Sequence, residues 1–129
     1  MTGVQTCALP IYNITLLGGQ VNSKYQFTYG ADAAQQLTNY HANKLVLSVD
    51  GIDIENGFST YYSEETPIDK TMINQSDVCI IVADKSKFRR NAFAKISQLD
   101  CADFIVTTCK LNSDELKIVK ENEITVVNV

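Results

Sequence analysis

The most constraining feature of this sequence is a nearly continuous apolar run at residues 78–83, with the sequence VCIIVA. A run of this length and β-branched character is typical of a parallel strand that is covered on both faces of its sheet. Shorter runs of the same kind occur at 44–49, 104–106 and 124–129. Because parallel strands need crossover segments between them, these runs predict an α/β fold.

Segments with helical spacing lie between the strand-like runs. After Gly30, apolar residues recur at Ala33, Ala34, Leu37 and Tyr40, which predicts one face of a helix. A second helix is expected to begin at a Ser63 or Thr66 cap, with Pro67 in its first turn and Ile68, Met72 and Ile73 facing inward. A third is expected from a Ser113 cap to Glu121, with Leu116 and Val119 as its apolar positions.

The first part of the chain predicts a further strand and an arm. Residues 13–17 are β-prone and end in a Gly18-Gly19 turn. Three alternating aromatic residues at 25–29 indicate a half-buried strand or an extended arm. A glycine-containing loop is expected between Asp53 and Gly57. The sequence as a whole predicts one α/β domain with a Rossmann-like, mostly parallel sheet and flanking helices.

Composition narrows the class of protein. The 129 residues are 45% apolar, which suits one globular domain and excludes a disordered chain. The net charge of −4 and a single adjacent basic pair, Arg89-Arg90, argue against a nucleic-acid-binding surface on this chain. No apolar run approaches the roughly 20 residues that a membrane helix needs.

The four cysteines do not form a metal or disulfide pattern. Cys7, Cys79, Cys101 and Cys109 are irregularly spaced, no two of them form a CxxC pair, and the chain has one histidine. We therefore expect reduced thiols, a cytosolic protein, and neither a zinc site nor a cofactor. Cys79 is expected to be a core residue.

Residues 1–11 match neither helical nor strand periodicity and lack the charged and apolar regions of a secretory signal. We interpret them as translated adapter or vector sequence, so that the genuine sequence would begin near Tyr12 and be cut off on its N-terminal side.

Polar and glycine-rich residues follow several predicted strands, where ligands bind in open α/β sheets. They are Gly18-Gly19 and the segments 50–53, 84–87 and 107–108. Asp50 and Asp53 could accept hydrogen bonds from ligand hydroxyls, and Lys70 or Lys87 could contact an anion such as phosphate. The glycine pair would allow close approach of the backbone to a ligand.

Each of these features also has a purely structural interpretation. Gly-Gly and Asp-Gly are common turn sequences. A lysine such as Lys87 is usually solvated, and His41 at a predicted helix end is more often structural than a ligand or a base. Their shared position at strand ends favours a site.

Several motifs occur in an order that resembles one known family. They are LLGG at 16–19, Gly30 before a helix, LSVDGID at 47–53 with Gly57, Met72-Ile73, and VADKSKF at 82–88. Together they resemble the C-terminal sensor domain of DeoR-type bacterial transcriptional repressors. The combination GIDxxxG followed by ADxSKF is the most specific part, and the resemblance runs from about Tyr12 to the C-terminus.

The resemblance implies a fold related to ribose-5-phosphate isomerase, other sugar-phosphate isomerases and CoA transferases. It also implies a phosphorylated sugar as effector, a preceding winged helix-turn-helix that binds DNA, and a homo-oligomer. On this basis the predicted effector site contains Gly18, Gly19, Asp50, Gly51, Asp53 and Lys87, with Lys70 added as a second cation.

The sequence departs from the family pattern in three places. Asp69, followed by Lys70, stands where the family usually has a lysine, and Thr107-Thr108 replaces a usual Thr-Asp. The helix-turn-helix and an Asp-x-Gly-Thr-Thr phosphate loop have no counterpart in this sequence. We therefore expect residues 12–129 to be a partial sensing domain.

Three functions follow as hypotheses. The first is the effector-sensing part of a regulator of sugar metabolism. The second is a sugar-phosphate isomerase that uses Asp50 or Asp53. An argument against it is that this sequence lacks the Lys-Gly-Gly-Gly stretch of ribose-5-phosphate isomerase and the stabilising donors that the stretch supplies. The third is a fragment without independent function, whose exposed apolar sheet edge promotes aggregation.

Overall fold

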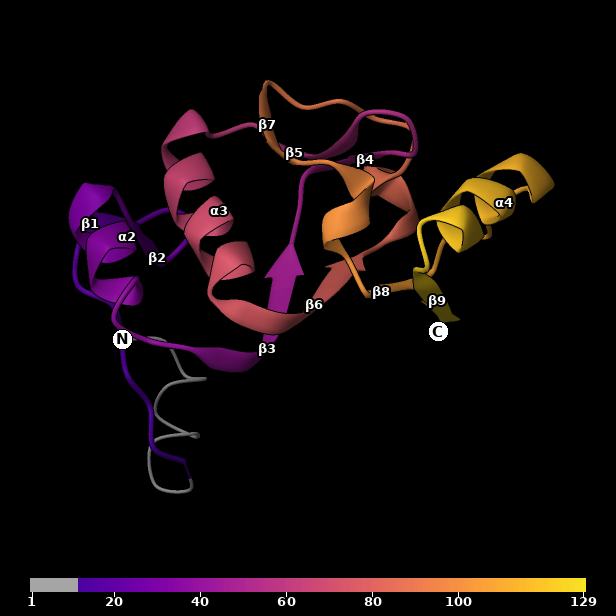
Figure 1. The fold of residues 1–129 in the computed structure, drawn as a ribbon. Coiled ribbons are helices and arrows are strands. Elements are labelled where there is room, and N and C mark those ends of the chain that lie inside the picture. Colours follow the sequence, from indigo (N-terminus) through magenta and orange to yellow (C-terminus); the bar gives the residue numbers. More distant parts are fainter. Residues whose placement is uncertain (1–11) are drawn as a thin grey trace.

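A four-stranded parallel sheet forms the centre of the molecule. The computed structural model describes residues 12–129 (Figure 1). The segment that we interpret as foreign, residues 1–11, lies outside the described residues. The sheet has the order β3-β6-β8-β9 and consists of β3 (Ala42–Ser48), β6 (Ser76–Ala83), β8 (Phe104–Thr107) and β9 (Thr125–Asn128). All three strand pairs are parallel, which confirms the predicted α/β class.

Helices form at all three predicted places: α2 (Ala31–Leu37), α3 (Thr66–Asn74) and α4 (Ser113–Glu121). The predicted caps are wrong. Ser63 lies in a short 3-10 turn, η1 (Ser63–Glu65), and Thr66 is already helical, with its buried Oγ1 lacking a hydrogen-bond partner. Asn112, rather than Ser113, caps α4, because its side chain accepts from the Glu115 amide.

One face of the parallel sheet forms the core. Its side chains include Leu45, Leu47, Cys79, Ile81 and Ile105, all of which are buried. They pack against apolar residues of α3, α4 and the 3-10 turn η3 (Leu99–Cys101), among them Met72, Ile73, Leu99, Ile118 and Val119. Leu116 and Tyr40, predicted to face inward, are about half exposed instead, and Tyr40 lies beyond the end of α2.

The opposite face of the sheet is exposed in residues 12–129. Val46 is 66% exposed, and Val82, Phe104 and Val127 are each about 40% exposed on the neighbouring strands. The expectation that residues 78–83 are covered on both faces is therefore wrong for the described structure, since the helices and turns of the core cluster pack only on the other face.

A small antiparallel sheet lies beyond the end of β3 (Figure 1). It has the order β4-β5-β7, with β4 (Gly51–Asp53), β5 (Gly57–Thr60) and β7 (Ala94–Ser97). The predicted loop through Gly57 is the hairpin of this sheet. All four residues of β5 are buried, so the strand lacks the alternation of polar and apolar residues by which sequence reasoning finds a half-buried strand.

The N-terminal part of the described chain forms a two-stranded hairpin of β1 (Gln20–Asn22) and β2 (Phe27–Tyr29) beside α2. Strand β2 confirms the prediction at the alternating aromatics. The strand predicted at 13–17 does not form, because this segment pairs with no other described strand and leaves Leu16 63% exposed. No helix within residues 12–129 has the length and apolar character needed to cross a membrane.

Three of the four cysteines lie in the described region. Cys79, Cys101 and Cys109 are free thiols, and Cys79 is buried in the core as predicted. Cys7 falls outside the described residues.

Candidate ligand-binding site

A cavity of about 330 Å³ lies at the carboxyl end of β3. This volume lies at the lower end of the range of small-molecule sites. The cavity is lined by residues of β2, β3, β5, η1 and the adjoining loops, which are Tyr25, Phe27, Ser48, Val49, Asp50, Thr60, Tyr62 and Glu65. Its position at the end of a parallel strand is the one expected for a site in an open α/β sheet.

Asp50 is the first polar residue after β3, and its carboxylate points into the cavity. Its Oδ2 accepts hydrogen bonds from the Thr60 hydroxyl and from the Tyr61 amide, each at 3.1 Å. Its Oδ1 lies 3.6 Å from the ammonium nitrogen of Lys87. Both side chains are partly exposed, so they remain accessible to a ligand.

Lys87 is held in place by the turn that follows β6. Asp84 caps the 3-10 turn η2 (Lys85–Lys87) by accepting a hydrogen bond from the Ser86 amide at 2.7 Å. Hydrogen bonding by the Ser86 side chain, and then by its amide, lowers the pKa of Asp84 and keeps its carboxylate ionised. Phe88, the next residue, is buried and forms a bridge with Ile52 of β4. The motif ADKSKF therefore anchors a turn that carries Lys87 to Asp50.

Thr60 links two carboxylates in the cavity wall. Its Oγ1 lies 3.1 Å from Asp50 and 2.9 Å from the Oε2 of Glu65. A hydroxyl carries one hydrogen, so it donates to only one of these carboxylates at a time. Burial raises the pKa of Glu65, and the nearby charge of Asp50 raises it further.

Asp69 lies one helical turn beyond Glu65 and is only 6% exposed. Its carboxyl group makes no hydrogen bond or ion pair with any residue between 12 and 129. Burial raises its pKa to about 7, and the charges of Glu65 and Asp50 add to the effect. The first turn of α3, next to the cavity-lining Glu65, therefore carries a buried acid whose pKa is raised toward neutrality.

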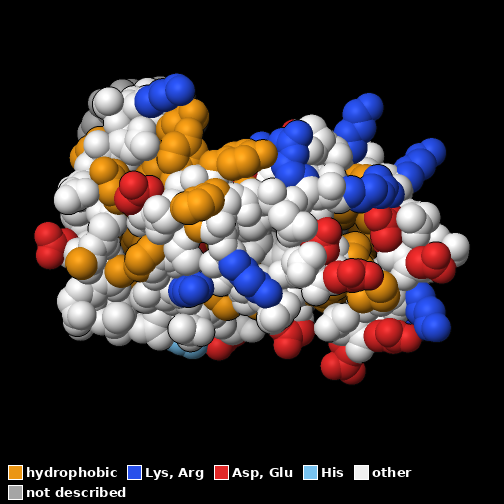
Figure 2. All heavy atoms as spheres, turned by 90° about the horizontal axis from the view of Figure 1, so that it is seen from above, with side chains coloured by type: hydrophobic (Ala, Val, Ile, Leu, Met, Phe, Trp, Pro, Cys, Tyr) orange, Lys and Arg blue, Asp and Glu red, His pale blue; other side chains and the backbone are white. Residues whose placement is uncertain are grey.

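Two tyrosines form the aromatic wall. The rings of Tyr25 and Tyr62 lie with their centroids 5.1 Å apart, and the ammonium of Lys24 lies 5.0 Å from the Tyr25 centroid. Hydrogen bonding with Tyr25 raises the pKa of Tyr62 to about 12, so Tyr62 is neutral at physiological pH. Hydrophobic and aromatic side chains gather over this left-hand part of the molecule, whereas charged side chains of both signs gather toward α4 (Figure 2).

Of the predicted site residues, Asp50 lines this cavity, and Lys87 contacts the Asp50 carboxylate. Gly51 follows directly but is packed inside the small sheet, where an added Cβ would lie 2.6 Å from the Arg90 carbonyl oxygen. Asp53 is turned to the other end of β4. Its Oδ1 accepts from the amides of Glu55 and Asn56, which closes the hairpin turn.

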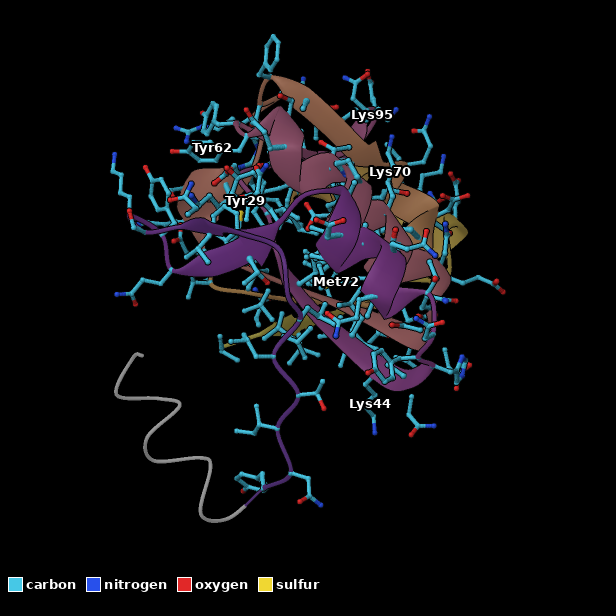
Figure 3. All side chains as sticks on the ribbon, turned by 90° about the vertical axis from the view of Figure 1, so that its left-hand side faces the viewer. Tyr29, Lys44, Tyr62, Lys70, Met72 and Lys95 are labelled. Atoms are coloured by element: carbon cyan, nitrogen blue, oxygen red, sulfur yellow. The ribbon has the colours of Figure 1, made fainter. Side chains whose placement is uncertain are left out.

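The remaining predicted residues lie apart from the cavity lining. The Gly18 amide donates to the Gln36 side chain of α2, and a Cβ on Gly19 would lie 2.6 Å from the Tyr29 carbonyl oxygen. Gly19 thus allows the chain to pack closely against α2 and β2, whereas a Cβ on Gly18 would make only an ordinary contact with Gln36. Lys70 is exposed on the side of α3 away from Tyr62, toward Lys95 (Figure 3).

Sequence reasoning missed most of the cavity wall, including Tyr25, Thr60, Tyr62 and Glu65. A signal existed for Glu65. It lies at a predicted helix start, four residues before Asp69, so the two acids share a helix face beside the inward-facing Ile68. Thr60 and the tyrosines enter the site only through the antiparallel sheet and the β1-β2 hairpin, which the sequence did not define.

Comparison with known proteins assigns this chain to a family. The sequence model described as the DeoR C terminal sensor domain matches residues 7–108. The putative aga operon transcriptional repressor of Escherichia coli O157:H7 is 33% identical over 116 residues, which cover 90% of this chain and 43% of that protein. The HTH-type transcriptional repressor GlcR of Bacillus subtilis (strain 168) is 32% identical over 94 residues, or 73% of this chain and 36% of that protein.

A third relative is more distant. The glycerol-3-phosphate regulon repressor of Escherichia coli (strain K12) is 24% identical over 96 residues, or 74% of this chain and 38% of that protein. The chain thus spans less than half the length of these curated relatives. Because the family model matches well over half of its residues, the chain belongs to the family of DeoR C-terminal sensor domains.

Proposed function

We propose that this chain is the effector-sensing part of a transcriptional regulator and that it binds a phosphorylated sugar in the cavity at the end of β3. The observation that carries the proposal is the pairing of Asp50, which lines that cavity, with the ammonium of Lys87 at 3.6 Å. A lysine ammonium suits a phosphate, and a carboxylate suits sugar hydroxyls.

The remaining lining fits a sugar ring. Thr60 and Glu65 add a hydroxyl and a carboxylate at hydrogen-bond distance from each other, and Tyr62 supplies an aromatic surface beside them. One relative is named for the regulon of a phosphate ester, glycerol 3-phosphate, which supports a phosphorylated effector.

Control of DNA binding would follow from coupling between this cavity and a DNA-binding domain. The relatives are named as transcriptional repressors, and the family resemblance implies a winged helix-turn-helix in the whole protein. An effector that binds one state of that protein more tightly shifts its population toward that state, and DNA must shift effector affinity by the same factor.

The geometry does not favour the isomerase hypothesis. Acid–base catalysis by Asp50 and Asp53 would need both carboxylates at one substrate. Asp50 faces the cavity, whereas Asp53 closes the hairpin turn at the other end of β4. We therefore expect no turnover of ribose 5-phosphate.

The test is calorimetric titration of the 129-residue chain with a panel of sugar phosphates and the matching unphosphorylated sugars. We expect at least one phosphorylated sugar to bind. The Lys87→Ala variant should weaken that binding by about ten-fold or more, the effect of losing one charge-assisted contact.

The matched control is Lys85→Ala, which removes an exposed lysine from the same 3-10 turn. It should leave the affinity unchanged. Equal losses in the two variants would show that general positive charge, rather than the cavity, attracts the phosphate. Absence of binding across the panel would overturn the proposal.

A further inference from the structure

Two cysteines that are distant in sequence lie together where β6 and β8 pair. The backbone of Cys79 in β6 is bonded twice to Asp103, because its carbonyl oxygen accepts from the Asp103 amide at 2.9 Å and its amide donates to the Asp103 carboxylate at 2.8 Å. Cys101, two residues before Asp103, ends η3 and packs against the core cluster that contains Cys79. Both residues therefore lie on the core side of the parallel sheet.

The two thiols contact each other, and a hydrogen bond joins them. Cys79 is 4% exposed, whereas Cys101 is only partly buried, so Cys101 is the sulfur that solvent reaches. Hydrogen bonds from Cys79 and then from the Ser97 side chain lower the pKa of Cys101, against the opposing charges of Asp100 and Asp103. A partly exposed thiol of lowered pKa beside a second thiol is the arrangement in which cysteines oxidise reversibly.

Cys109 has different surroundings and provides an internal control. It is also 4% exposed, but its thiol donates to the Lys110 carbonyl oxygen at 3.7 Å, and its sulfur lies 4.0 Å from the Arg89 guanidinium. Burial without a neighbouring thiol makes a cysteine inert. The three described cysteines thus differ in burial and in partner, which predicts that they differ in reactivity.

We propose that Cys101 and Cys79 form an oxidation-responsive pair that hydrogen peroxide converts to a disulfide. The Cys101 sulfur attacks one peroxide oxygen and the O–O bond breaks, which leaves a sulfenic acid and releases the other oxygen as water with the thiol proton. The Cys79 sulfur then attacks the sulfenic sulfur, and its own proton leaves with the hydroxyl as a second water. The two thiols lose two electrons, which reduce one peroxide to two waters.

The disulfide would tie η3 to the middle of the parallel sheet. This turn connects β7 to β8, and β7 pairs with β5, which supplies Thr60 to the cavity wall. Oxidation would therefore restrain the small sheet that forms part of the candidate site. Neither cysteine lines the cavity, so the pair is independent of the effector and of the proposed function.

Hydrogen peroxide is the probe, added to the folded 129-residue chain carrying Cys7→Ser. This background keeps three of the four cysteines. Thiol titration after unfolding should fall from three groups to one, the chain should lose the mass of two hydrogen atoms, and dithiothreitol should reverse both changes. A count that stays at three under conditions that oxidise free cysteine, or disulfides between chains in place of an internal one, would overturn the proposal.

Peptide mapping assigns the bond in the same protein. Cleavage before aspartate places Cys79 on residues 77–83, Cys101 on residues 100–102 and Cys109 on residues 103–113. We expect the first two peptides to be linked and the third to keep its thiol. A link that includes the Cys109 peptide would show that the neighbouring thiols are not the reactive pair.

Single substitutions separate the two roles, and circular dichroism checks that each variant folds. Cys101→Ser should slow the loss of thiols at least about ten-fold and abolish the disulfide. Cys79→Ala should leave a sulfenic acid on Cys101 that dimedone traps, whereas Cys109→Ala should form the disulfide like the parent chain. An equal rate of thiol loss in Cys101→Ser and in the parent would contradict the assignment of Cys101 as the attacking sulfur.

Discussion

At the scale of single residues, Gly57 is the position least able to accept a side chain. Its φ is +89°, and a Cβ there would overlap the carbonyl oxygen of Ser97 on the neighbouring strand. Because both backbone strain and a backbone clash oppose a side chain, Gly57→Ala should lower the free energy of unfolding by at least about 2 kcal/mol. Urea denaturation followed by circular dichroism measures this change.

Gly18→Ala is the matched control for that substitution. A Cβ on Gly18 would meet only the Gln36 side chain, at 3.7 Å, which is an ordinary contact. Its free energy of unfolding should therefore change by less than about 0.5 kcal/mol. Similar losses in both variants would contradict the assignment of Gly57 to a strained and crowded turn.

Asp69 should make stability depend on pH in a defined direction. In the unfolded chain its pKa is near 3.8, whereas burial and the neighbouring carboxylates raise it to about 7 in the folded protein. Between these values the folded state holds a proton that the unfolded state has lost, so Asp69 makes the free energy of unfolding fall as pH rises from about 4 to 7.

Comparison with Asp69→Asn isolates this contribution from the other acids. The variant should be more stable than the parent at pH 8, by up to about 4 kcal/mol, and nearly equal to it near pH 4. Urea denaturation at both pH values measures the difference. A constant difference across the range would show that the substitution alters packing, and that Asp69 ionises at its ordinary pKa.

The site residues differ in how well the sequence defines them. Asp50 and Lys87 could be predicted because each lies in the short polar segment after a strong apolar strand, and strand ends in a parallel sheet meet at one edge. Asp53 and Lys70 carry the same chemistry, but one closes a turn and the other lies on the exposed side of α3. Side-chain direction depends on local geometry that residue type does not encode.

At the scale of elements, α4 depends on a reciprocal cap. The Asn112 side chain accepts from the Glu115 amide at 2.9 Å, and the Glu115 side chain accepts from the Asn112 amide at 2.9 Å. Asn112→Ala should therefore lower the free energy of unfolding by about 1 kcal/mol. Thermal melting measures it, with exposed Lys117→Ala in the same helix expected to differ by less than about 0.5 kcal/mol.

Glu115 is more than a capping residue. Its Oε2 also accepts from Arg89 at 2.7 Å, which ties the start of α4 to the segment after η2. If Asn112→Ala and Lys117→Ala are equally stable, this ion pair and the packing of α4 hold the helix without help from the cap.

Elements were predictable where periodicity is strong. The parallel strands are continuous apolar runs, and the helices have apolar residues at intervals of three and four positions. The antiparallel sheet was missed because β4 and β5 are short and their burial does not alternate. The segment 13–17 has strand propensity, but β structure also requires a partner strand, which only tertiary structure supplies.

At the scale of the whole molecule, the parallel sheet has two unlike faces. One is the core, and the other exposes apolar residues on all four strands, including Val46, Val82, Phe104 and Val127. Parallel sheets are normally covered on both faces. The hypothesis of a fragment without independent function placed the aggregation-prone apolar surface at a sheet edge. In the described residues a whole face of the sheet is exposed as well.

Neighbouring residues of β3 test this difference between the faces. Leu47 is buried in the core, whereas Val46 is 66% exposed on the opposite face. Leu47→Ala should lower the free energy of unfolding by about 2–5 kcal/mol. Val46→Thr should change it by less than about 0.5 kcal/mol.

Self-association should depend on the exposed face of the sheet rather than on the core, because exposed apolar surface drives contact between copies of the chain. Sedimentation velocity over a range of concentrations should show association of the parent chain, and Val46→Thr combined with Val82→Thr should weaken it. Asp100→Asn, on the other side of the sheet, serves as a surface control. A parent chain that stays monomeric at high concentration would show that this face does not drive contact between copies.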